Sequence, residues 1–166
     1  MLARLYSKMC DRYPWFRKIS RKQMYQLMAV GYPRPDWTFM NYGYAPEDPS
    51  ETPDLQTEDE INRYCIQLYH HVAKAVELEG REVLEVGSGR GGGADYIKRY
   101  LGPQRMVGVD FSEKAVNLCR RHYPVEGLSF ELSDAEDLSF NDQSFDVVIN
   151  IESSHCYGSM DDFLAQ

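Results

Sequence analysis

One short stretch limits most strongly what this chain can fold into: an apolar run that breaks into glycines just before a segment of helical character. Residues 83–86 have the composition of a buried strand, and residues 87–93 contain five glycines. Glycine permits backbone angles that a Cβ would penalise, and it lets main-chain N–H groups approach a ligand closely. The stretch therefore predicts a strand that leads into a cofactor-binding turn.

The spacing of these glycines fits two classes of cofactor. Gly87, Gly89 and Gly92 spell G-x-G-x-x-G, the dinucleotide fingerprint, whereas Gly87, Gly89 and Gly91 spell the G-x-G-x-G of proteins that use S-adenosylmethionine (SAM). The glycines alone leave both interpretations open, together with a glycine-rich turn that binds nothing.

A second strand ends in an acid. Residues 106–110 form an apolar run that finishes at Asp110, roughly 20 residues beyond the glycine loop, where a carboxylate that binds a nucleotide ribose is expected. Asp110 could instead cap the following helix, but Ser112, with Glu113 behind it, is better placed for capping. We therefore predict that Asp110 accepts hydrogen bonds from the ribose hydroxyls.

Two more strands are predicted further along the chain. Residues 128–132 have the pattern of a third strand, and residues 145–151 that of a fourth, with a polar turn at 141–144 before it. An acidic segment, residues 133–140, follows the third strand. Alternating strands and helical segments are typical of an α/β fold with a parallel sheet.

Four ordered motifs within residues 80–166 carry a family resemblance. They are E-x-G-x-G-x-G starting at Glu85, the strand-end Asp110, D-A-E-x-L-x-F over 134–140 and S-F-D-V-V-I-N over 144–150. In this combination the chain resembles class I SAM-dependent methyltransferases of the type 11 kind.

Two shorter strings narrow the resemblance. F-M-N-Y-G-Y at 39–44 and N-I-E-S-S-H-C-Y at 150–157 are similar to O-methyltransferases of small molecules and lipids, of the phthiotriol/phenolphthiotriol dimycocerosate type. The resemblance implies transfer of a methyl group from SAM to a hydroxyl of a small-molecule or lipid acceptor. It also implies a Rossmann-like fold whose first four parallel strands lie in the order 3-2-1-4.

By the same resemblance, Glu85 and residues 87–91 face the methionine end of SAM, Asp110 the ribose, Asp134 with Ala135 the adenine, and Asn150 the floor of the site. A carboxylate can accept from the exocyclic amine of adenine, and a backbone N–H can donate to a ring nitrogen. The cofactor-binding candidates are Glu85, Gly87, Ser88, Gly89, Gly91, Asp110, Phe111, Asp134, Ala135, Glu136 and Asn150.

His155 is the candidate general base, because it follows the fourth strand at the edge where α/β folds bind ligands and because imidazole titrates near neutrality. It could equally shape the pocket or cap the next turn. Phosphoethanolamine methyltransferases, which have a similar fold, use a tyrosine–histidine pair, so Tyr42 or Tyr44 is predicted to meet His155 across the acceptor pocket.

Composition excludes other partners and sites. A net charge of -8 argues against nucleic acid, whose phosphates require a basic surface. The four cysteines are far apart, with no C-x-x-C and no secretory signal, which indicates reduced thiols in a cytoplasmic protein. No metal site is predicted, since the adjacent His70 and His71 would point in different directions on a helix.

The first part of the chain, residues 1–56, is predicted to be a helical and loop lid, and residues 57–166 the N-terminal part of a SAM-binding domain. Residues 1–22 contain seven bases and a single acid, with apolar residues at helical spacing, and Pro14 divides them. Such a segment could contact a membrane surface or acyl chain, or pack as a lid over the active site.

A helix with a capping box is predicted from Thr57 with Glu60, and Gly80 marks its end. Tyr64 and Tyr69 are expected in the core. The predicted apolar stripe consists of Ile61, Cys65, Leu68, Val72 and Val76.

The family fold has more strands after the fourth, so we expect the C-terminal half of the sheet to be absent and the fourth strand to form an open edge. This expectation leaves two alternatives beside a methyltransferase. One is a truncated fragment that binds SAM without catalysis. The other is a fragment of an NAD-binding oxidoreductase, which would not explain the D-A-E segment at 134–136.

Overall fold

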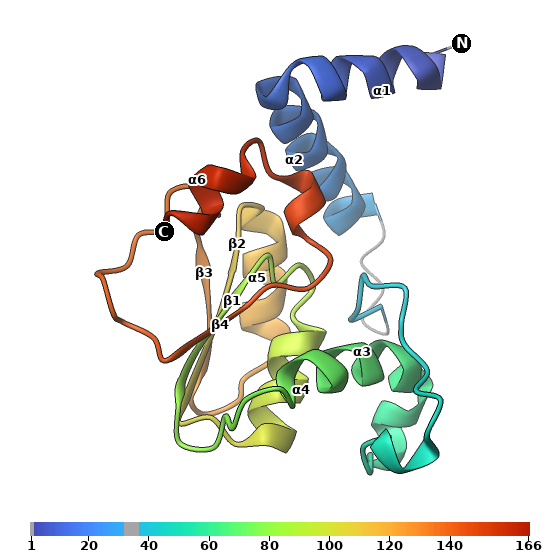
Figure 1. The fold of residues 1–166 in the computed structure, drawn as a ribbon, viewed down its shortest axis with the longest axis vertical. Coiled ribbons are helices and arrows are strands. Elements are labelled where there is room, and N and C mark those ends of the chain that lie inside the picture. Colours follow the sequence, from blue (N-terminus) through green and yellow to red (C-terminus); the bar gives the residue numbers. More distant parts are fainter. Residues whose placement is uncertain (1, 32–36) are drawn as a thin grey trace.

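The computed structural model describes residues 2–31 and 37–166, and a parallel sheet lies at its centre (Figure 1). Its strands, in the order β3-β2-β1-β4, confirm the predicted α/β fold. The carboxyl ends of parallel strands share one edge, where open α/β sheets bind ligands. The strands are β1 Glu82–Val86, β2 Arg105–Asp110, β3 Leu128–Leu132 and β4 Val147–Ile149.

Strand β1 lies in the middle of the sheet. Val83 pairs with Met106 of β2 on one side and with Val147 of β4 on the other. A strand that is covered on both faces and both edges needs a nearly continuous apolar sequence. The run from Val83 to Val86 meets this requirement except at Glu85, which is wholly buried.

Helices α3 Arg63–Ala73, α4 Gly92–Leu101 and α5 Glu113–His122 cover one face of the sheet. The other face packs against the loop that follows β3 and against the short helix α6, Met160–Leu164. The first core includes Ile66, Ile97, Val83, Met106, Val116 and Phe130. The second includes Leu84, Val86, Val107, Val109 and Ala135.

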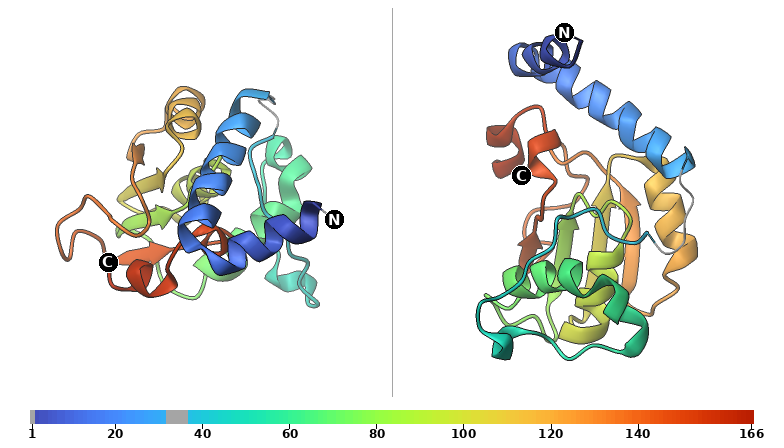
Figure 2. Two further views of the ribbon diagram at one scale, coloured as in Figure 1. Left: turned by 90° about the horizontal axis from the view of Figure 1, so that it is seen from above. Right: turned by 90° about the vertical axis from the view of Figure 1, so that its right-hand side faces the viewer.

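The described part of the chain starts with two helices, α1 Leu2–Arg12 and α2 Pro14–Gly31. Pro14 is the first residue of α2, where a missing N–H costs nothing, so the predicted division of this segment is confirmed. Figures 1 and 2 show α1 projecting from the body while α2 lies across the edge of the sheet that carries the strand ends. The sequence of residues 31–36, which contains a glycine and two prolines, predicts a break after this helix; residues 32–36 lie outside the described residues.

The predicted capping box at Thr57 is wrong. Residues Thr57–Asn62 form a 3-10 helix, and the α-helix begins six residues later at Arg63, without a side-chain cap. Because a 3-10 turn has a different angular period, the face toward the core shifts. The buried residues of α3 are Ile66, Gln67, Tyr69 and Ala73.

The shifted face overturns several expectations. Ile61 is 81% exposed, and Tyr64, expected in the core, is 64% exposed, whereas Tyr69 is buried as predicted. The helix ends at Ala73 rather than close to Gly80. A short 3-10 turn, Pro49–Glu51, lies in the preceding loop.

Strand β4 is shorter than predicted. The backbone N–H of Asp146 donates to Glu82 O at 2.8 Å, but regular pairing covers only Val147–Ile149. At the other end, Asn150 uses its side-chain amide to reach Val86 O, at 2.9 Å. A side-chain hydrogen bond to the neighbouring main chain replaces the next ladder bond and ends the strand.

Candidate functional site

The glycine loop turns sharply at the carboxyl end of β1. Gly87, Gly89 and Gly91 all have positive φ angles, which other residues rarely adopt. At Gly87 the space is also restricted, because an added Cβ would lie 2.3 Å from the Ser153 Oγ. Gly91 is the N-cap of α4 in the left-handed conformation.

Several main-chain N–H groups of the glycine loop donate hydrogen bonds to carbonyl oxygens of the protein itself. The N–H groups of Gly87 and Ser88 donate to Val109 O at 2.8 and 2.9 Å, which fastens the start of the loop to β2. Gly91 N donates to Ser88 O at 2.9 Å. These bonds fix the loop's path without any contribution from a ligand.

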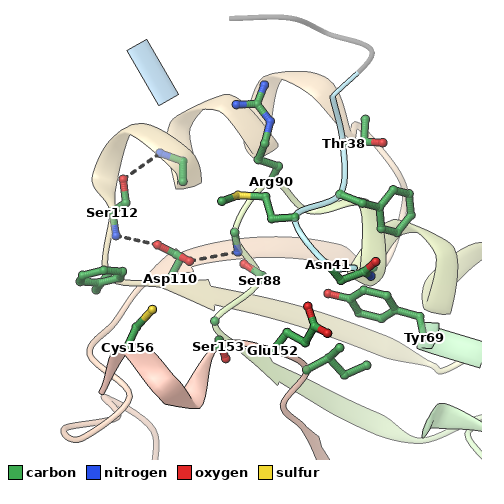
Figure 3. A pocket seen from close by; sticks show the side chains of 18 of the residues that line it. Thr38, Asn41, Tyr69, Ser88, Arg90, Asp110, Ser112, Glu152, Ser153 and Cys156 are labelled. Carbon is green, nitrogen blue, oxygen red and sulfur yellow. Dashed lines mark hydrogen bonds between the residues drawn. The ribbon is translucent and has the colours of Figure 1, made fainter. Parts of the chain in front are cut away.

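Two adjoining pockets open beside this loop, and their shared wall consists of Gly87, Asp110, Phe111, Cys156 and Tyr157. The first pocket (Figure 3) has about 860 Å³ of empty space, its open mouth included. Its other polar and apolar walls come from residues 37–41, 88–90 and 151–153, with Tyr69, Gly93, Ser112 and Ala115. The second pocket is completed by Lys18, Val86, Val109, Ser133, Asp134, Ala135 and Glu136.

Asp110 stands where the two pockets meet. Its Oδ2 accepts from Gly89 N at 3.0 Å and its Oδ1 from Ser112 N at 2.8 Å, while Ser112 Oγ caps α5 at Ala115 N (Figure 3). The predicted N-cap is thus confirmed. Burial raises the pKa of Asp110 to about 6, although the two backbone N–H groups oppose the shift.

Glu85 lies beneath the loop and is not part of either pocket wall. The Tyr69 hydroxyl donates to its Oε1 at 2.6 Å, and Tyr69 itself lines the first pocket. Burial raises the pKa of Glu85 to about 7, and the charge of Asp110 adds to this rise, whereas the Tyr69 hydrogen bond lowers it. The ring of Tyr69 occupies the place that a side chain at Gly93 would need, 1.9 Å from the added Cβ.

Ser88 has an unused polar atom that faces the first pocket. Its hydroxyl is buried and has no hydrogen-bond partner among the described residues, yet the residue lines the first pocket. A buried hydroxyl without a partner is costly. A polar group of a ligand in this pocket would satisfy it.

A strap formed by residues 37–41 closes one side of the first pocket. The Arg90 guanidinium donates to Trp37 O and lies over the indole ring, 4.8 Å from its centroid. Gly92 N, at the start of α4, donates to Thr38 O at 3.1 Å. Asn41 Nδ2 donates to Cys65 O at 3.1 Å. The strap is therefore fastened to both the glycine loop and α3.

The acidic segment after β3 forms the far wall of the second pocket. Asp134 and Glu136 both face Lys18 of α2, whose Nζ lies 2.7 Å from Asp134 Oδ2 and 2.5 Å from Glu136 Oε2. Glu136 Oε1 also accepts from Ser159 N at 2.7 Å. Asp137, the third acid of this segment, is exposed.

Asn150 supports the pocket wall from behind. Its Nδ2 lies 2.7 Å from both Ser153 Oγ and Tyr157 OH, in addition to its bond to Val86 O. Ser153 and Tyr157 line the first pocket, whereas Asn150 does not. Asn150 therefore acts on the pocket by fixing two side chains that reach it.

The three predicted catalytic residues are not brought together at the pocket. His155 is exposed in the 3-10 turn η3, Ser154–Cys156. Tyr42 is 98% exposed, and the ring of Tyr44 lies against His71, with 4.3 Å between centroids. None of the three lines either pocket.

A different acid faces the first pocket. Glu152 lines it, on the side of Asn41 and Tyr69 (Figure 3), and its Oε2 accepts from Tyr42 N at 3.1 Å. Its φ of 50° is unusual for a residue other than glycine. Backbone strain of this kind is found preferentially at functional sites.

Comparison with known proteins decides the family. The family model described as a methyltransferase domain matches residues 83–166. The chain belongs to this methyltransferase family. The resemblance proposed from the motifs is thereby confirmed, and the NAD-binding oxidoreductase is excluded as the family.

Two curated relatives match most of this methyltransferase-family chain. A fatty-acid O-methyltransferase of Mycolicibacterium smegmatis is 43% identical over 161 residues, 94% of this chain and 58% of the relative. A phthiotriol/phenolphthiotriol dimycocerosates methyltransferase of Mycobacterium tuberculosis is 44% identical over 142 residues, 86% of this chain and 52% of the relative. The chain spans about half the length of the curated relatives it matches.

A solved structure agrees in fold. The geranyl diphosphate C-methyltransferase from Streptomyces coelicolor matches 78% of this chain and 54% of its own, with a TM-score of 0.58 and 19% sequence identity. The Rossmann-like class I methyltransferase fold is thus confirmed for the part of the chain that the structure describes.

The described residues were also searched for a metal site and for a membrane-spanning helix. Among them, no group of three or more histidine, cysteine, aspartate or glutamate side chains could hold a metal ion. No described helix is long and apolar enough to cross a membrane. The pocket residues that were not among the predicted site residues include Lys18, Tyr69, Glu152, Ser153 and the strap. Glu152, Ser153 and part of the strap lie in the two short strings that carried the narrower resemblance, whereas Lys18 and Tyr69 had no such signal.

Proposed function

We propose that this chain binds SAM and, in the active protein, transfers its methyl group to a hydroxyl of a small-molecule or lipid acceptor. The observation that carries the proposal is the position of Asp110, at the junction of two pockets beside a glycine loop. A ribose on this carboxylate would extend toward the loop on one side and toward Asp134 and Ala135 on the other.

The residues present fit SAM. The unpartnered Ser88 hydroxyl and the loop would hold the methionine end in the first pocket, and Asp110 would accept from the ribose hydroxyls. Asp134, Ala135 and Glu136 would surround the adenine in the second pocket. Glu85 and Asn150 would act from behind the wall, through Tyr69 and through Ser153 with Tyr157.

SAM supplies a methyl group activated by a sulfonium, so the protein need contribute only alignment, exclusion of water and removal of the hydroxyl proton. The strap at residues 37–41 and Tyr69 enclose the first pocket and would align the acceptor there. Alignment can contribute about 7–11 kcal/mol, whereas a general base contributes about 10²- to 10⁴-fold in rate. Positioning by the pocket walls is the larger effect.

We assign proton removal to Glu152, because its carboxylate reaches the first pocket. His155, the residue predicted from the sequence, is the rival candidate; it lies between the pocket residues Ser153 and Cys156 but lines neither pocket itself. A tyrosine–histidine pair from Tyr42 or Tyr44 has no support from the geometry, since Tyr44 stacks on His71 and Tyr42 points into solvent.

A lipid acceptor is supported by two observations. The curated relatives are named for fatty-acid and phthiotriol dimycocerosate substrates, and the first pocket has apolar walls that include Phe39, Met40 and Ile151. The four cysteines form no disulfide with one another, and we propose a cytoplasmic compartment, in which thiols stay reduced.

We further propose that residues 1–22 contact an anionic bilayer surface. On α2, Trp15 and Ile19 are 60% and 55% exposed, while Arg17 and Lys18 turn toward the body of the protein. On α1, Leu5 is 59% exposed beside the exposed bases Arg4, Lys8 and Arg12. Exposed apolar side chains flanked by bases complement the negative headgroups and apolar interior of such a surface.

Calorimetry of SAM and NAD binding tests the proposed function. The chain should bind SAM and not NAD, and Asp110→Ala should weaken SAM binding by about 1.5–3 kcal/mol, the range for hydrogen bonds to a charged group. Asp137→Ala, a change of an exposed acid in the neighbouring loop, is the control and should leave the affinity unchanged. Equal affinity of Asp110→Ala and the unmodified chain would refute the assignment. Binding without methyl transfer would favour the non-catalytic alternative.

A further inference from the structure

We propose that Lys18 is a residue of the cofactor site: its ammonium holds α2 closed across the adenine end by pairing with Asp134 and Glu136, so that a bound S-adenosyl ligand leaves only after this contact breaks. The proposal rests on the proposed function for the identity of the ligand. We call this three-residue contact, Lys18 with Asp134 and Glu136, the latch.

The latch joins two distant parts of the chain at one atom. Lys18 Nζ lies within 2.7 Å of Asp134 and 2.5 Å of Glu136, and Lys18 is itself part of the wall of the second pocket. Its side chain is 32% exposed, and that of Glu136 only 13%. Ion pairs that are partly shielded from water are screened less by salt than fully exposed ones.

A second contact keeps α2 in the same place. The Arg17 guanidinium donates to Gly158 O at 2.9 Å, in the segment that joins η3 to α6. Glu136, one of the two acids of the latch, accepts a hydrogen bond from Ser159 N in this same segment. Lys18 and Arg17 therefore fasten α2 to both walls of the pocket mouth, the acidic segment after β3 and the turn after β4.

In the first turns of α2, charged residues face the protein and apolar residues face outward, which is the reverse of an ordinary surface helix. Arg17 and Lys18 face the protein, whereas Trp15 and Ile19 face outward. A surface helix normally turns its apolar side toward the core. The contact between α2 and the pocket mouth therefore relies on charge, which makes it reversible and sensitive to salt.

The electrostatics of the three groups agree with this arrangement. Burial lowers the pKa of Lys18, but its hydrogen bonds to Asp134 and Glu136 raise it more, so the net shift is upward. Burial raises the pKa of Glu136, but Lys18 and the Ser159 N–H lower it more. Both groups therefore keep their charges at neutral pH, and the latch is closed under ordinary conditions.

The latch also positions a cofactor contact. Asp134 Oδ1 accepts from Glu136 N at 3.2 Å, and Lys18 holds the other oxygen, so the carboxylate plane is fixed on both sides. An adenine amine that approaches Asp134 meets an oriented acceptor. Loss of Lys18 should affect the ligand twice, through a mobile Asp134 and through an open α2.

The experiment measures how fast SAM and S-adenosylhomocysteine leave the protein, by stopped-flow dilution. Lys18→Met, which keeps the length and helix propensity of the side chain, should accelerate release by roughly 2- to 30-fold, the range for the loss of two partly exposed ion pairs. Lys18→Arg should stay close to the unmodified rate. The control is Lys8→Met, an exposed base on α1, which should have no effect.

Two further readouts separate a latch from general destabilisation. Raising the salt concentration should accelerate release from the unmodified protein but not from Lys18→Met. In a double-mutant cycle, the effects of Glu136→Gln and Lys18→Met should be less than additive, because both changes break the Lys18–Glu136 contact. Amides of α2 should exchange faster with deuterium in both variants, with or without ligand, while the melting temperature of the sheet is preserved.

Each outcome of these measurements either supports or overturns the latch. Equal release rates for Lys18→Met and the unmodified protein, with SAM bound by both, would overturn the latch and leave the proposed function intact. Additive effects in the double-mutant cycle would also overturn it. Failure of the unmodified chain to bind SAM, measured first by calorimetry, would overturn the proposed function and the latch together.

Discussion

Replacing Glu85 by glutamine should remove a pH dependence of stability that this single residue creates. Glu85 is wholly buried beneath the glycine loop, and the Tyr69 hydroxyl is its hydrogen-bond donor. Burial, reinforced by the charge of Asp110, raises its pKa from 4.5 to about 7. The folded protein therefore holds this proton over a range in which the unfolded chain has released it.

The sign and size follow from linkage. Between pH 4.5 and about 7 the folded state binds more protons at Glu85 than the unfolded state does, so stability falls as the pH rises. Each pH unit in this window is worth about 1.4 kcal/mol, so Glu85 should cost the fold on the order of 3 kcal/mol once the pH exceeds about 7. This is a large share of the stability of an ordinary domain.

Urea unfolding at several pH values between about 5 and 8 measures the effect. The unfolding free energy of the unmodified protein should decline relative to that of Glu85→Gln as the pH rises. Asp95, whose pKa burial also raises, is present in both proteins and cancels in this difference, whereas Asp110 interacts with the charge of Glu85 and cancels only in part. The amide of glutamine can leave a buried donor without a partner, so only the slope with pH carries the test, not the absolute stability.

Tyr69→Phe supplies the opposite perturbation. The Tyr69 hydrogen bond lowers the pKa of Glu85, so its removal should move the loss of stability to higher pH. A difference between Glu85→Gln and the unmodified protein that stays constant from about pH 5 to 8 would refute the reasoning.

Two further predictions concern proton removal at the acceptor and contact with a bilayer. In methyl-transfer assays with labelled SAM and lipid hydroxyl acceptors, Glu152→Gln should lower turnover by about 10²- to 10⁴-fold, whereas His155→Ala should stay within a few-fold of the unmodified protein; the reverse pattern would restore His155 as the base. In sedimentation with vesicles, the chain should bind those that contain phosphatidylglycerol and not pure phosphatidylcholine, and Trp15→Ser with Ile19→Ser should abolish binding. Self-association through the exposed Trp15 and Ile19 side chains would contradict the bilayer contact. It would be seen as a concentration-dependent sedimentation coefficient with no vesicle binding.

Local signals in the sequence predicted the strands, the glycine loop and the Ser112 cap. Residues 83–86 are apolar because a central strand is buried on both faces, and Ser112 precedes the first turn of α5 because its hydroxyl caps that turn. Each of these features is decided by neighbours within a few residues. The strand order depends instead on pairing between distant residues, and it was predicted only through the family resemblance.

Long-range contacts were beyond the sequence. Lys18 meets Glu136 and Tyr69 meets Glu85 across stretches that no short pattern connects. The register of α3 was mispredicted because Thr57 begins a 3-10 helix, and nothing in its composition distinguishes that from the first turn of an α-helix. His155 follows the fourth strand as expected, but it is exposed in a 3-10 turn and lines neither pocket.

The internally bonded amides of the glycine loop bear on ligand charge. Dinucleotide-binding loops leave their amides free at the start of the helix, so that these can donate to a pyrophosphate. Here the amide of Gly89 is taken by the Asp110 carboxylate, and that of Gly92 by the Thr38 carbonyl. A pyrophosphate would therefore find these two donors occupied and the Asp110 carboxylate beside it, which distinguishes this loop from one that binds a dinucleotide through free amides.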